Sequence, residues 1–557
     1  MLRPLVVALA AGLLAVPLAA SASTASGTHG AVATDQHLAS EVGLEVLRTG
    51  GNAVDAAVAI GYTLAVTYPS AGNLGGGGFM LVHMADGATH FIDFRETAPA
   101  GASAAMYQDA AGHVIPERST VGALAVAVPG TVAGLEYARE HYGTRPRHDL
   151  MRPAITYADE GFRLDANDAA VFARGTALLA NFSKSRAIFT RNGMPLRAGD
   201  TLRQPQLAAT LRAIDEDGAD AFYQGATGKQ LANAVLADGG LLSSEDLANY
   251  AVKLREPVEC EHHGEHVIAA PPPSSGGVAI CEVLGILGDA PSAAFRGVDD
   301  AHLEIEAERR AFADRAALGD PDFITPPIAR LLDPAYLARE RASIARARAT
   351  PSSKIHGTAL HEGTNTTNYS VVDRAGDAVD VTYTLNSTFG SGMVAGDTGV
   401  LLNDEMDDFT SASSVPNQFG LIQGAANAIA PGKRPLSSMV PTILTDPNGK
   451  VRLVAGAAGG PRIITTTLDL VREIVDFGID PGVAIDAPRV HEQWLPDVVY
   501  AEPNAFTDAT LAQLRAMRYT LAIEPAGSAA NAIIVRPDGT RIAAHDDRRP
   551  TGSALAY

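Results

Sequence analysis

Hydrophobic positions follow a helical spacing in the first part of the chain. Between residues 35 and 68 they recur every three to four positions, with an interruption at Gly50-Gly51. Asn52 is a favourable N-cap for a second helix, and Asp55 occupies its third position. The sequence therefore predicts a helical hairpin. Its second helix, 53–66, is apolar almost all round and is expected to lie between layers of the fold.

A glycine run, Gly75–Gly78, follows this hairpin and precedes two strand-like segments, 79–84 and 90–94, joined by a turn at Asp86-Gly87. Glycines near an acidic residue, here Asp93, are one mark of a dinucleotide-binding loop. Such a loop leaves a strand and opens a helix, whereas this run leaves a helix and opens a strand. We therefore expect the glycines to allow a close approach of two backbones.

Helical patterns dominate residues 121–345, interrupted by Pro272–Gly277, which is expected to end a strand and launch a helix. Just before this interruption three histidines crowd a short hairpin that turns at Gly264. Imidazoles are common metal ligands, but no second cluster rich in carboxylates is evident in the sequence. A solvated turn without a metal is the interpretation that the sequence favours for these residues, which are His262, His263 and His266.

Beyond Thr366 the pattern changes to short strands joined by tight turns. Helical stretches at 463–475 and 508–518 lie between and after these strands. Helices that cover strands in this order indicate the α+β class, built in layers.

Two hairpins of this region bring polar residues together. Pairing of 367–372 with 378–385 sets Thr366 nearly opposite Thr384. Pairing of 440–444 with 451–454 sets a serine pair close to a glycine pair, and those glycines precede a helix whose first N–H groups form an anion site. Each pair alone is common, but hydroxyls beside an amide-lined pocket in adjoining hairpins are parts of an acyl-transfer site. The serines are Ser437 and Ser438, and the glycines are Gly459 and Gly460.

Composition narrows the classes of function. The 557 residues include 43 Lys and Arg against 63 Asp and Glu, a net charge of −20, so no nucleic-acid partner is expected. With 46% hydrophobic and 19% charged residues, a fibrous or largely disordered chain is excluded. Two cysteines are too few for a disulfide scaffold, a thiolate zinc finger or a cysteine-ligated iron–sulfur cluster. The length predicts more than one domain.

The first residues are typical of an export signal. Arg3 is followed by an apolar stretch and by the small-residue cleavage site Ala20-Ser21-Ala22. We expect residues 1–22 to be removed, which leaves a periplasmic or secreted protein without a membrane anchor. In such a compartment Cys260 and Cys281 could pair, and two buried free thiols fit the sequence equally well.

Motifs in order along the chain resemble those of the γ-glutamyltranspeptidases. They are Gly75–Gly78, Asp93–Glu96, Pro271–Gly277, Leu318–Phe323, Asn365–Asp373, Asn403–Phe409 and Arg434–Met439. The resemblance runs from about Gly30 to the C-terminus. It implies a four-layer αββα fold of the N-terminal-nucleophile hydrolases. It also implies a precursor that cuts itself between Asn365 and Thr366 into a heterodimer of a large subunit, 23–365, and a small subunit, 366–557.

The resemblance further implies a role for each site residue. Cleavage would give Thr366 a free α-amine, whose ordinary pKa of about 7.7 to 8.0 suits a general base for its own hydroxyl. Thr384 would hydrogen-bond this nucleophile, and the amides of Gly459 and Gly460 would hold the oxyanion. The α-carboxylate of the donor would be bound by Arg95, Ser437 and Ser438, and its α-ammonium by Asn386, Glu405 and Asp408. No cofactor and no metal are implied.

The implied activity is that of a γ-glutamyltransferase and glutathione hydrolase. The γ-glutamyl group of glutathione or a related donor would pass to water, an amino acid or a peptide. One alternative is a β-lactam acylase of the glutaryl or cephalosporin type with the same fold and nucleophile. Its glutaryl group lacks the α-ammonium, so Asn386, Glu405 and Asp408 argue against it. The other alternative is an uncleaved periplasmic binding protein for amino acids or peptides.

Some residues depart from the family pattern or have a simpler interpretation. Phe419 stands in the lid segment where bacterial members usually have tyrosine, and it cannot donate a phenol hydrogen bond, so we expect hydrolysis to gain over transfer. Asn368 stands where histidine is frequent. Without the resemblance, Arg95 beside Glu96 would be interpreted as an exposed ion pair. Asp407-Asp408 would be interpreted as a solvated face or as a metal cluster, although the spacing lacks an EF-hand pattern.

Overall fold

The computed structural model describes residues 23–111, 113–115, 117–288, 294–355, 365–410, 425–525 and 527–557. The predicted export signal and Phe419 lie outside these ranges. None of the helices in the described part of the chain is long and apolar enough to cross a membrane.

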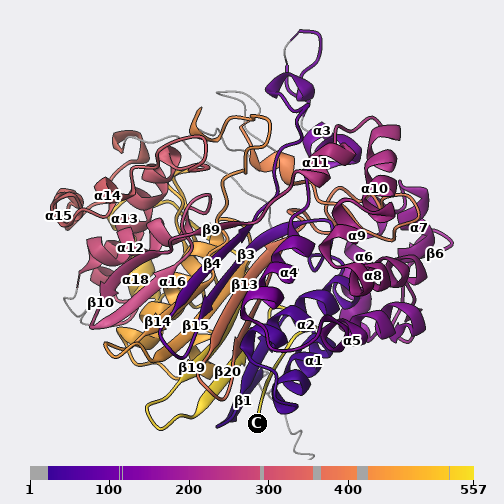
Figure 1. The fold of residues 1–557 in the computed structure, drawn as a ribbon. Coiled ribbons are helices and arrows are strands. Elements are labelled where there is room, and N and C mark those ends of the chain that lie inside the picture. Colours follow the sequence, from indigo (N-terminus) through magenta and orange to yellow (C-terminus); the bar gives the residue numbers. More distant parts are fainter. Residues whose placement is uncertain are drawn as a thin grey trace, which may run out of the picture.

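Two antiparallel sheets form the centre of the molecule (Figure 1). The first has the order β1 (Ser23–Gly27), β20 (Arg541–His545), β19 (Ala529–Val535), β15 (Val451–Ala458), β14 (Thr442–Thr445), β11 (Glu265–Ala269) and β10 (Val258–His262). The second has the order β21 (Ser553–Ala556), β2 (Ala31–Thr34), β12 (Thr367–Val372), β13 (Ala378–Thr384), β3 (Gly77–His83), β4 (Thr89–Phe94) and β9 (Lys253–Arg255). Each sheet therefore combines strands from both halves of the chain.

Helices cover the outer faces of both sheets. The second sheet carries α1 (His37–Arg48), α2 (Ala53–Thr67), α4 (Thr131–Tyr142), α5 (Arg147–Glu160) and α8 (Pro205–Asp217). The first sheet carries α12 (Gly276–Leu287), α13 (Val298–Asp314) and α16 (Arg462–Val475). Successive side chains of β3 point to opposite faces of the second sheet. Met80 and Val82 lie in the core under α2, and Phe79 and Leu81 lie in the core between this sheet and the first. The predicted αββα layers are confirmed.

The remaining elements are shorter or peripheral. The helices are α3 (Glu117–Thr120), α6 (Ala166–Leu179), α7 (Ser183–Phe189), α9 (Ala219–Tyr223), α10 (Ala226–Ala237), α11 (Ser244–Ala248), α14 (Ile328–Leu331), α15 (Pro334–Ser343), α17 (Pro481–Ala484) and α18 (Asp508–Ala516). The strands are β5 (Phe162–Arg163), β6 (Thr190–Arg191), β7 (Met194–Pro195), β8 (Thr201–Leu202), β16 (Val490–His491), β17 (Val499–Ala501) and β18 (Leu521–Ile523).

The predicted helical hairpin is confirmed. The side chain of Asn52 accepts a hydrogen bond from the N–H of Asp55, and the Asp55 carboxylate accepts one from the N–H of Asn52. Every residue of α2 is buried, as its apolar circumference predicted. The hairpin of β14 and β15 differs from the prediction, because β14 starts at Thr442 rather than at Val440. Pro441 has no N–H to give to a sheet, which explains the later start.

The glycine run brings backbones together, as expected. A Cβ atom added at Gly76 would lie 2.0 Å from the carbonyl oxygen of Thr384, and one added at Gly75 would lie 2.2 Å from that of Leu401. Any larger residue would push these segments apart. The run therefore lets β3 approach the end of β13, where Thr384 lies.

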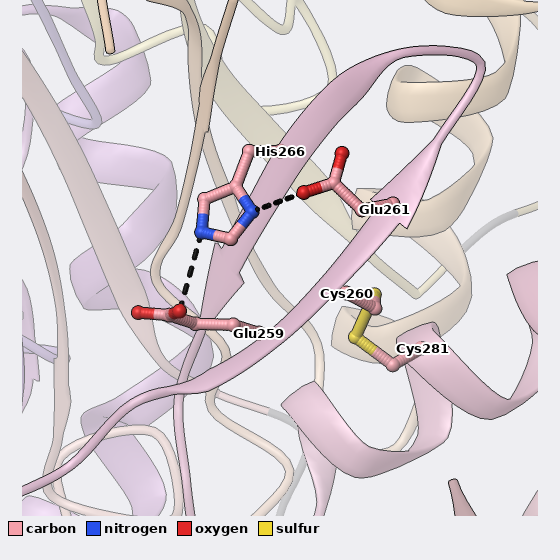
Figure 2. The surroundings of a disulfide bond; sticks show 5 residues. All are labelled: Glu259, Cys260, Glu261, His266 and Cys281. Atoms are coloured by element: carbon pink, nitrogen blue, oxygen red, sulfur yellow. Dashed lines mark hydrogen bonds and ion pairs between the residues drawn. A yellow bond between two sulfur atoms is a disulfide. The ribbon is translucent and has the colours of Figure 1, made fainter. Parts of the chain in front are cut away.

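The two cysteines form a disulfide, which decides between the two alternatives that the sequence left open. The bond joins Cys260 on β10 to Cys281 on α12, as Figure 2 shows. It fastens the hairpin of β10 and β11 to the helix that follows it in the chain.

Candidate active site

Thr366 lies at the start of β12 and is buried. In the observed register Thr367 pairs with Tyr383, so Thr366 comes level with Thr384, as predicted. The hydroxyl of Thr384 donates a hydrogen bond of 2.8 Å to the carbonyl oxygen of Asn365 and accepts one of 2.8 Å from the N–H of Asn386. One threonine side chain thus holds the carbonyl of the peptide bond between Asn365 and Thr366.

An arginine and an aspartate, which the sequence did not predict as site residues, contact the backbone on the other side of Thr366. The guanidinium of Arg549 donates to the carbonyl oxygen of Thr366, and it lies 2.6 Å from a carboxylate oxygen of Asp35. It also reaches the side-chain oxygen of Asn365 at 3.4 Å. The same Asp35 oxygen accepts a hydrogen bond from the Thr367 hydroxyl at 3.0 Å. These contacts fix the backbone around the predicted cleavage point.

The predicted oxyanion glycines connect β15 to α16. Gly459 has φ +137° and Gly460 has φ +61°, backbone conformations that other residues rarely adopt. A Cβ atom at Gly459 would lie 2.5 Å from the carbonyl oxygen of Gly527. The first N–H groups of α16 therefore follow directly on a turn that only glycine fits, which suits a site for negative charge.

The packing of the two sheets places Thr366 at the same end as these glycines. Asn368 of β12 lies against Gly456 of β15, where an added Cβ would come within 2.2 Å of the Asn368 amide nitrogen. At the other end of β12, the carbonyl oxygen of Asp373 accepts a hydrogen bond of 3.0 Å from Arg541 of β20. Arg541 pairs with Val535 of β19, and the preceding residue of β19 pairs with Leu453 near the start of β15. The two strands therefore run in opposite directions, so the start of β12 and the end of β15 share one edge of the sandwich.

The predicted serine pair is buried beside β14. Ser437 donates its N–H to the carbonyl of Pro273 at 2.8 Å, while the Ser438 hydroxyl is buried without a hydrogen-bond partner among the described residues. The register of β14 with β15 pairs Thr442 with Ala455. Continued past Pro441, this register keeps the serine pair on the side of Gly459.

Arg95 is the centre of a buried charge cluster. Its guanidinium contacts the carboxylates of Glu405 and Asp408, and it is only 1% exposed. Its Nε donates to the carbonyl of Pro435 at 3.3 Å, and Nη2 reaches that of Leu436 at 3.5 Å, directly before the serine pair. An exposed ion pair at Arg95 and a solvated face at Asp407-Asp408 are therefore wrong, because all three residues are buried.

Asn386 links the charge cluster to the threonines. Its backbone has φ +76°, and its side-chain amide donates to the carbonyl of Asp404 at 3.0 Å, directly before Glu405. The structure thus joins Asn365, Thr384, Asn386 and the Arg95 cluster through consecutive hydrogen bonds.

Comparison with known proteins decides the family. The protein-family model for Gamma-glutamyltranspeptidase matches residues 39–557 of this chain. The chain belongs to this family. It is 49% identical to the glutathione hydrolase proenzyme of Pseudomonas sp. (strain A14), over 97% of this chain and 96% of the relative. It is 46% identical to that of Escherichia coli (strain K12), over 95% of this chain and 92% of the relative. The solved cephalosporin acylase from Bacillus halodurans superposes with a TM-score of 0.86 at 26% identity, and covers 99% of both chains. The N-terminal-nucleophile hydrolase fold is confirmed.

Carboxylates outnumber cations in the Arg95 cluster. Burial raises the pKa of Glu405 and of Asp408, although the Arg95 charge acts in the opposite direction. Burial also raises the pKa of Glu96 to about 7, and it raises the pKa of Asp404. The buried guanidinium of Arg315 also acts on Asp408, but two guanidiniums do not neutralise four carboxylates. The cluster therefore favours either bound protons or an additional cation.

Asp380 of β13 lies between the sheets, close to Gly456 of β15. Asn368, which stands where the family frequently has histidine, donates to both carboxylate oxygens at 3.2 and 3.1 Å, and the Ser370 hydroxyl donates at 2.7 Å. Burial nevertheless raises the pKa of Asp380 to about 7. The side chain holds its proton well above the pH at which an exposed aspartate loses it.

This shifted pKa predicts a pH-dependent stability. Between about pH 4 and the native pKa of about 7, the folded protein keeps a proton that the unfolded chain has lost. The free energy of unfolding therefore falls as the pH rises through this window, and no further above it. In a Thr366→Ala background, the free energy of unfolding should be a few kcal/mol lower near pH 8 than near pH 5 because of Asp380, as measured by urea unfolding. Asp380→Asn should abolish this difference. Asp397→Asn, which removes an exposed carboxylate, is the control. An unchanged fall in Asp380→Asn would contradict the assignment.

Proposed function

We propose that the protein is a γ-glutamyltransferase and glutathione hydrolase that cleaves itself between Asn365 and Thr366. The observation that carries this proposal is the hydrogen bond that the Thr384 hydroxyl donates to the carbonyl oxygen of Asn365. The names of the relatives, glutathione hydrolase proenzymes, support both the activity and the processing.

Self-cleavage begins with attack of the Thr366 hydroxyl on the carbonyl carbon of Asn365. The carbonyl oxygen gains negative charge, and the Thr384 hydroxyl already donates a hydrogen bond to it. The peptide C–N bond breaks, the nitrogen takes a proton, and an ester joins Asn365 to the Thr366 oxygen. Water then hydrolyses this ester, which leaves a carboxyl group on Asn365 and a free α-amine on Thr366. The large subunit would be 23–365 and the small subunit 366–557.

In turnover the same residue serves as base and nucleophile. The α-amine of Thr366 takes the hydroxyl proton while the oxygen attacks the γ-carbonyl carbon of the donor. Amides of Gly459 and Gly460 stabilise the oxyanion, and the leaving amine departs with the proton. Water, an amino acid or a peptide then attacks the γ-glutamyl ester, which restores Thr366.

The Arg95 cluster recognises the head of the donor. The α-carboxylate binds Arg95 together with Ser437 and Ser438, and the unpartnered, buried hydroxyl of Ser438 supports this role. The α-ammonium binds Asn386, Glu405 and Asp408, a role that the excess of buried carboxylates supports. Without a donor, the guanidinium pairs with these carboxylates, so binding exchanges an internal ion pair for two pairs with the ligand.

The likeness to a solved cephalosporin acylase keeps an acylase activity as the second candidate. A glutaryl group would leave the carboxylates of Glu405 and Asp408 without an ammonium partner, and buried charges without partners are costly. This difference favours γ-glutamyl donors. An uncleaved binding protein is disfavoured, because the relatives are named hydrolase proenzymes.

Export and the lid remain part of the proposal. Removal of residues 1–22 would deliver the enzyme to the periplasm or the medium. Phe419, which lies outside the described residues, would cover the pocket without a phenol hydrogen bond and so favour hydrolysis over transfer.

Thr366→Ala removes the attacking oxygen and should stay a single chain without activity. A denaturing gel shows the chain, and release of the amine from a γ-glutamyl anilide shows the activity. The matched control Thr366→Ser keeps a hydroxyl and should still give two fragments. Amine release by Thr366→Ala would contradict the assigned nucleophile.

Asp408→Asn should reduce the use of γ-glutamyl donors selectively. Loss of one partner of a buried charge pair costs about 2 kcal/mol or more, so kcat/KM for a γ-glutamyl anilide should fall on the order of 30-fold. A glutaryl anilide, which carries no α-ammonium, should lose much less. An equal loss for both anilides would mean that Asp408 does not bind the ammonium.

A further inference from the structure

Two histidines and an aspartate meet where the hairpin of β10 and β11 reaches the end of α16. Nε2 of His262 lies 2.6 Å from Oδ1 of Asp476, and Nε2 of His263 lies 3.8 Å from the same oxygen. One ligand atom from each of the three residues lies within 4.8 Å of the others. His262 is only 2% exposed, so the solvated turn that the sequence favoured is wrong for this residue. The carboxylate that the sequence did not reveal comes from a helix more than two hundred positions away.

The turn brings both imidazoles to one side. Neighbouring residues of an extended strand point to opposite faces of the sheet. Here β10 ends at His262, and His263 has φ +49° before Gly264 with φ +81°, which is the pattern of a two-residue hairpin turn. The two ring centroids are consequently 4.6 Å apart. The left-handed conformation is uncommon outside glycine, and in this turn it is what places His263 beside Asp476.

Charge around the cluster favours a cation. The other carboxylate oxygen of Asp476 is 3.2 Å from Nε of Arg472, which leaves Oδ1 for the histidines. Arg472 is itself paired with Asp300 at 2.6 Å and Glu304 at 2.7 Å. The arginine is therefore already balanced by two other carboxylates and does not cancel the charge of Asp476.

The ligand types and spacing suit zinc. Imidazole nitrogens and carboxylate oxygens bind Zn²⁺ at about 2.0 to 2.2 Å, which puts tetrahedral ligand atoms about 3.4 Å apart. The separations from Oδ1 to the two histidines, 2.6 and 3.8 Å, lie on either side of this value, so shifts of less than about 1 Å would form the site. The His263 side chain is 27% exposed, which gives the ion a path of entry and room for water as a further ligand.

We propose that His262, His263 and Asp476 bind one divalent ion of the zinc type. The ion joins a hairpin that the Cys260–Cys281 disulfide already fastens to α12 (Figure 2) to the helix that starts after Gly459 and Gly460. If the chain is cleaved after Asn365, hairpin and helix belong to different subunits, and the ion bridges them. The bridging of two subunits rests on the proposed function, whereas binding of the ion does not.

The test is calorimetric titration of Zn²⁺ into the signal-free full chain, made without a histidine tag and stripped with a chelator. The wild type should bind one ion per chain. His263→Asn, which keeps a residue suited to the left-handed turn, and Asp476→Asn should each weaken binding by at least about 10- to 100-fold, the loss typical even of an outer-shell partner.

His266→Asn is the matched control from the same hairpin. Its imidazole lies between two other carboxylates, as Figure 2 shows, with Glu259 at 3.2 Å and Glu261 at 2.8 Å. His266 is not one of the three residues of the cluster. This variant should keep the affinity of the wild type. Absence of Zn²⁺ binding, or equal binding by the wild type, His263→Asn and Asp476→Asn, would overturn the proposal.

Two measurements separate this proposal from the proposed function. Uncleaved Thr366→Ala should bind Zn²⁺ like the wild type although it is inactive, because none of the ligands depends on cleavage. In the cleaved wild type, Zn²⁺ should raise the urea concentration at which the subunits separate, and it should not do so in His263→Asn. An unchanged separation in the wild type would overturn the bridging role.

Discussion

The antiparallel pairing of β12 with β13 is the constraint on which the rest of the site depends. It sets Thr384 beside the peptide bond before Thr366. A slip of one strand by one residue would turn the side chains of that strand to the other face of the sheet, so the two threonines would no longer meet. The turn between the strands secures the register, because one carboxylate oxygen of Asp373 accepts hydrogen bonds from the N–H groups of Ala375, Gly376 and Asp377. Turn chemistry at the far end of the hairpin thus determines where Thr366 and Thr384 lie.

The donor site proposed at the Arg95 cluster depends on a second physical principle, the burial of more carboxylates than cations. One guanidinium, that of Arg95, faces several carboxylates away from water. Such an arrangement is costly for a resting protein, and a ligand that carries both an ammonium and a carboxylate relieves it. The proposed recognition of an amino-acid head rests on the same imbalance that accompanies the raised pKa values of Glu405 and Asp408.

Local signals in the sequence predicted the first helical hairpin, the strands after the glycine run and the two later β-hairpins. Three features could be recognised in the chain because each depends only on neighbouring residues. They are the cap at Asn52, the turns of the β12–β13 and β14–β15 hairpins, and the glycine run. Family motifs then assigned the site residues. What could not be predicted depends on contacts across long separations. Asp35 and Arg549 are 514 positions apart and meet because β2 pairs with the final strand, β21. In the sequence, Arg548-Arg549 gives no sign that Asp35 is the partner. The burial of Arg95 and the approach of Asp476 to the histidines were hidden for the same reason.

The account stands on a free amino group at Thr366. Intact-mass analysis of purified, fully active protein, followed by sequencing of the smaller fragment from its N-terminus, tests this most directly. The expected result is two polypeptides, with the smaller one beginning Thr-Thr-Asn-Tyr-Ser. A single mass with the bond after Asn365 unbroken, in a preparation that turns over γ-glutamyl anilide at full rate, would contradict it.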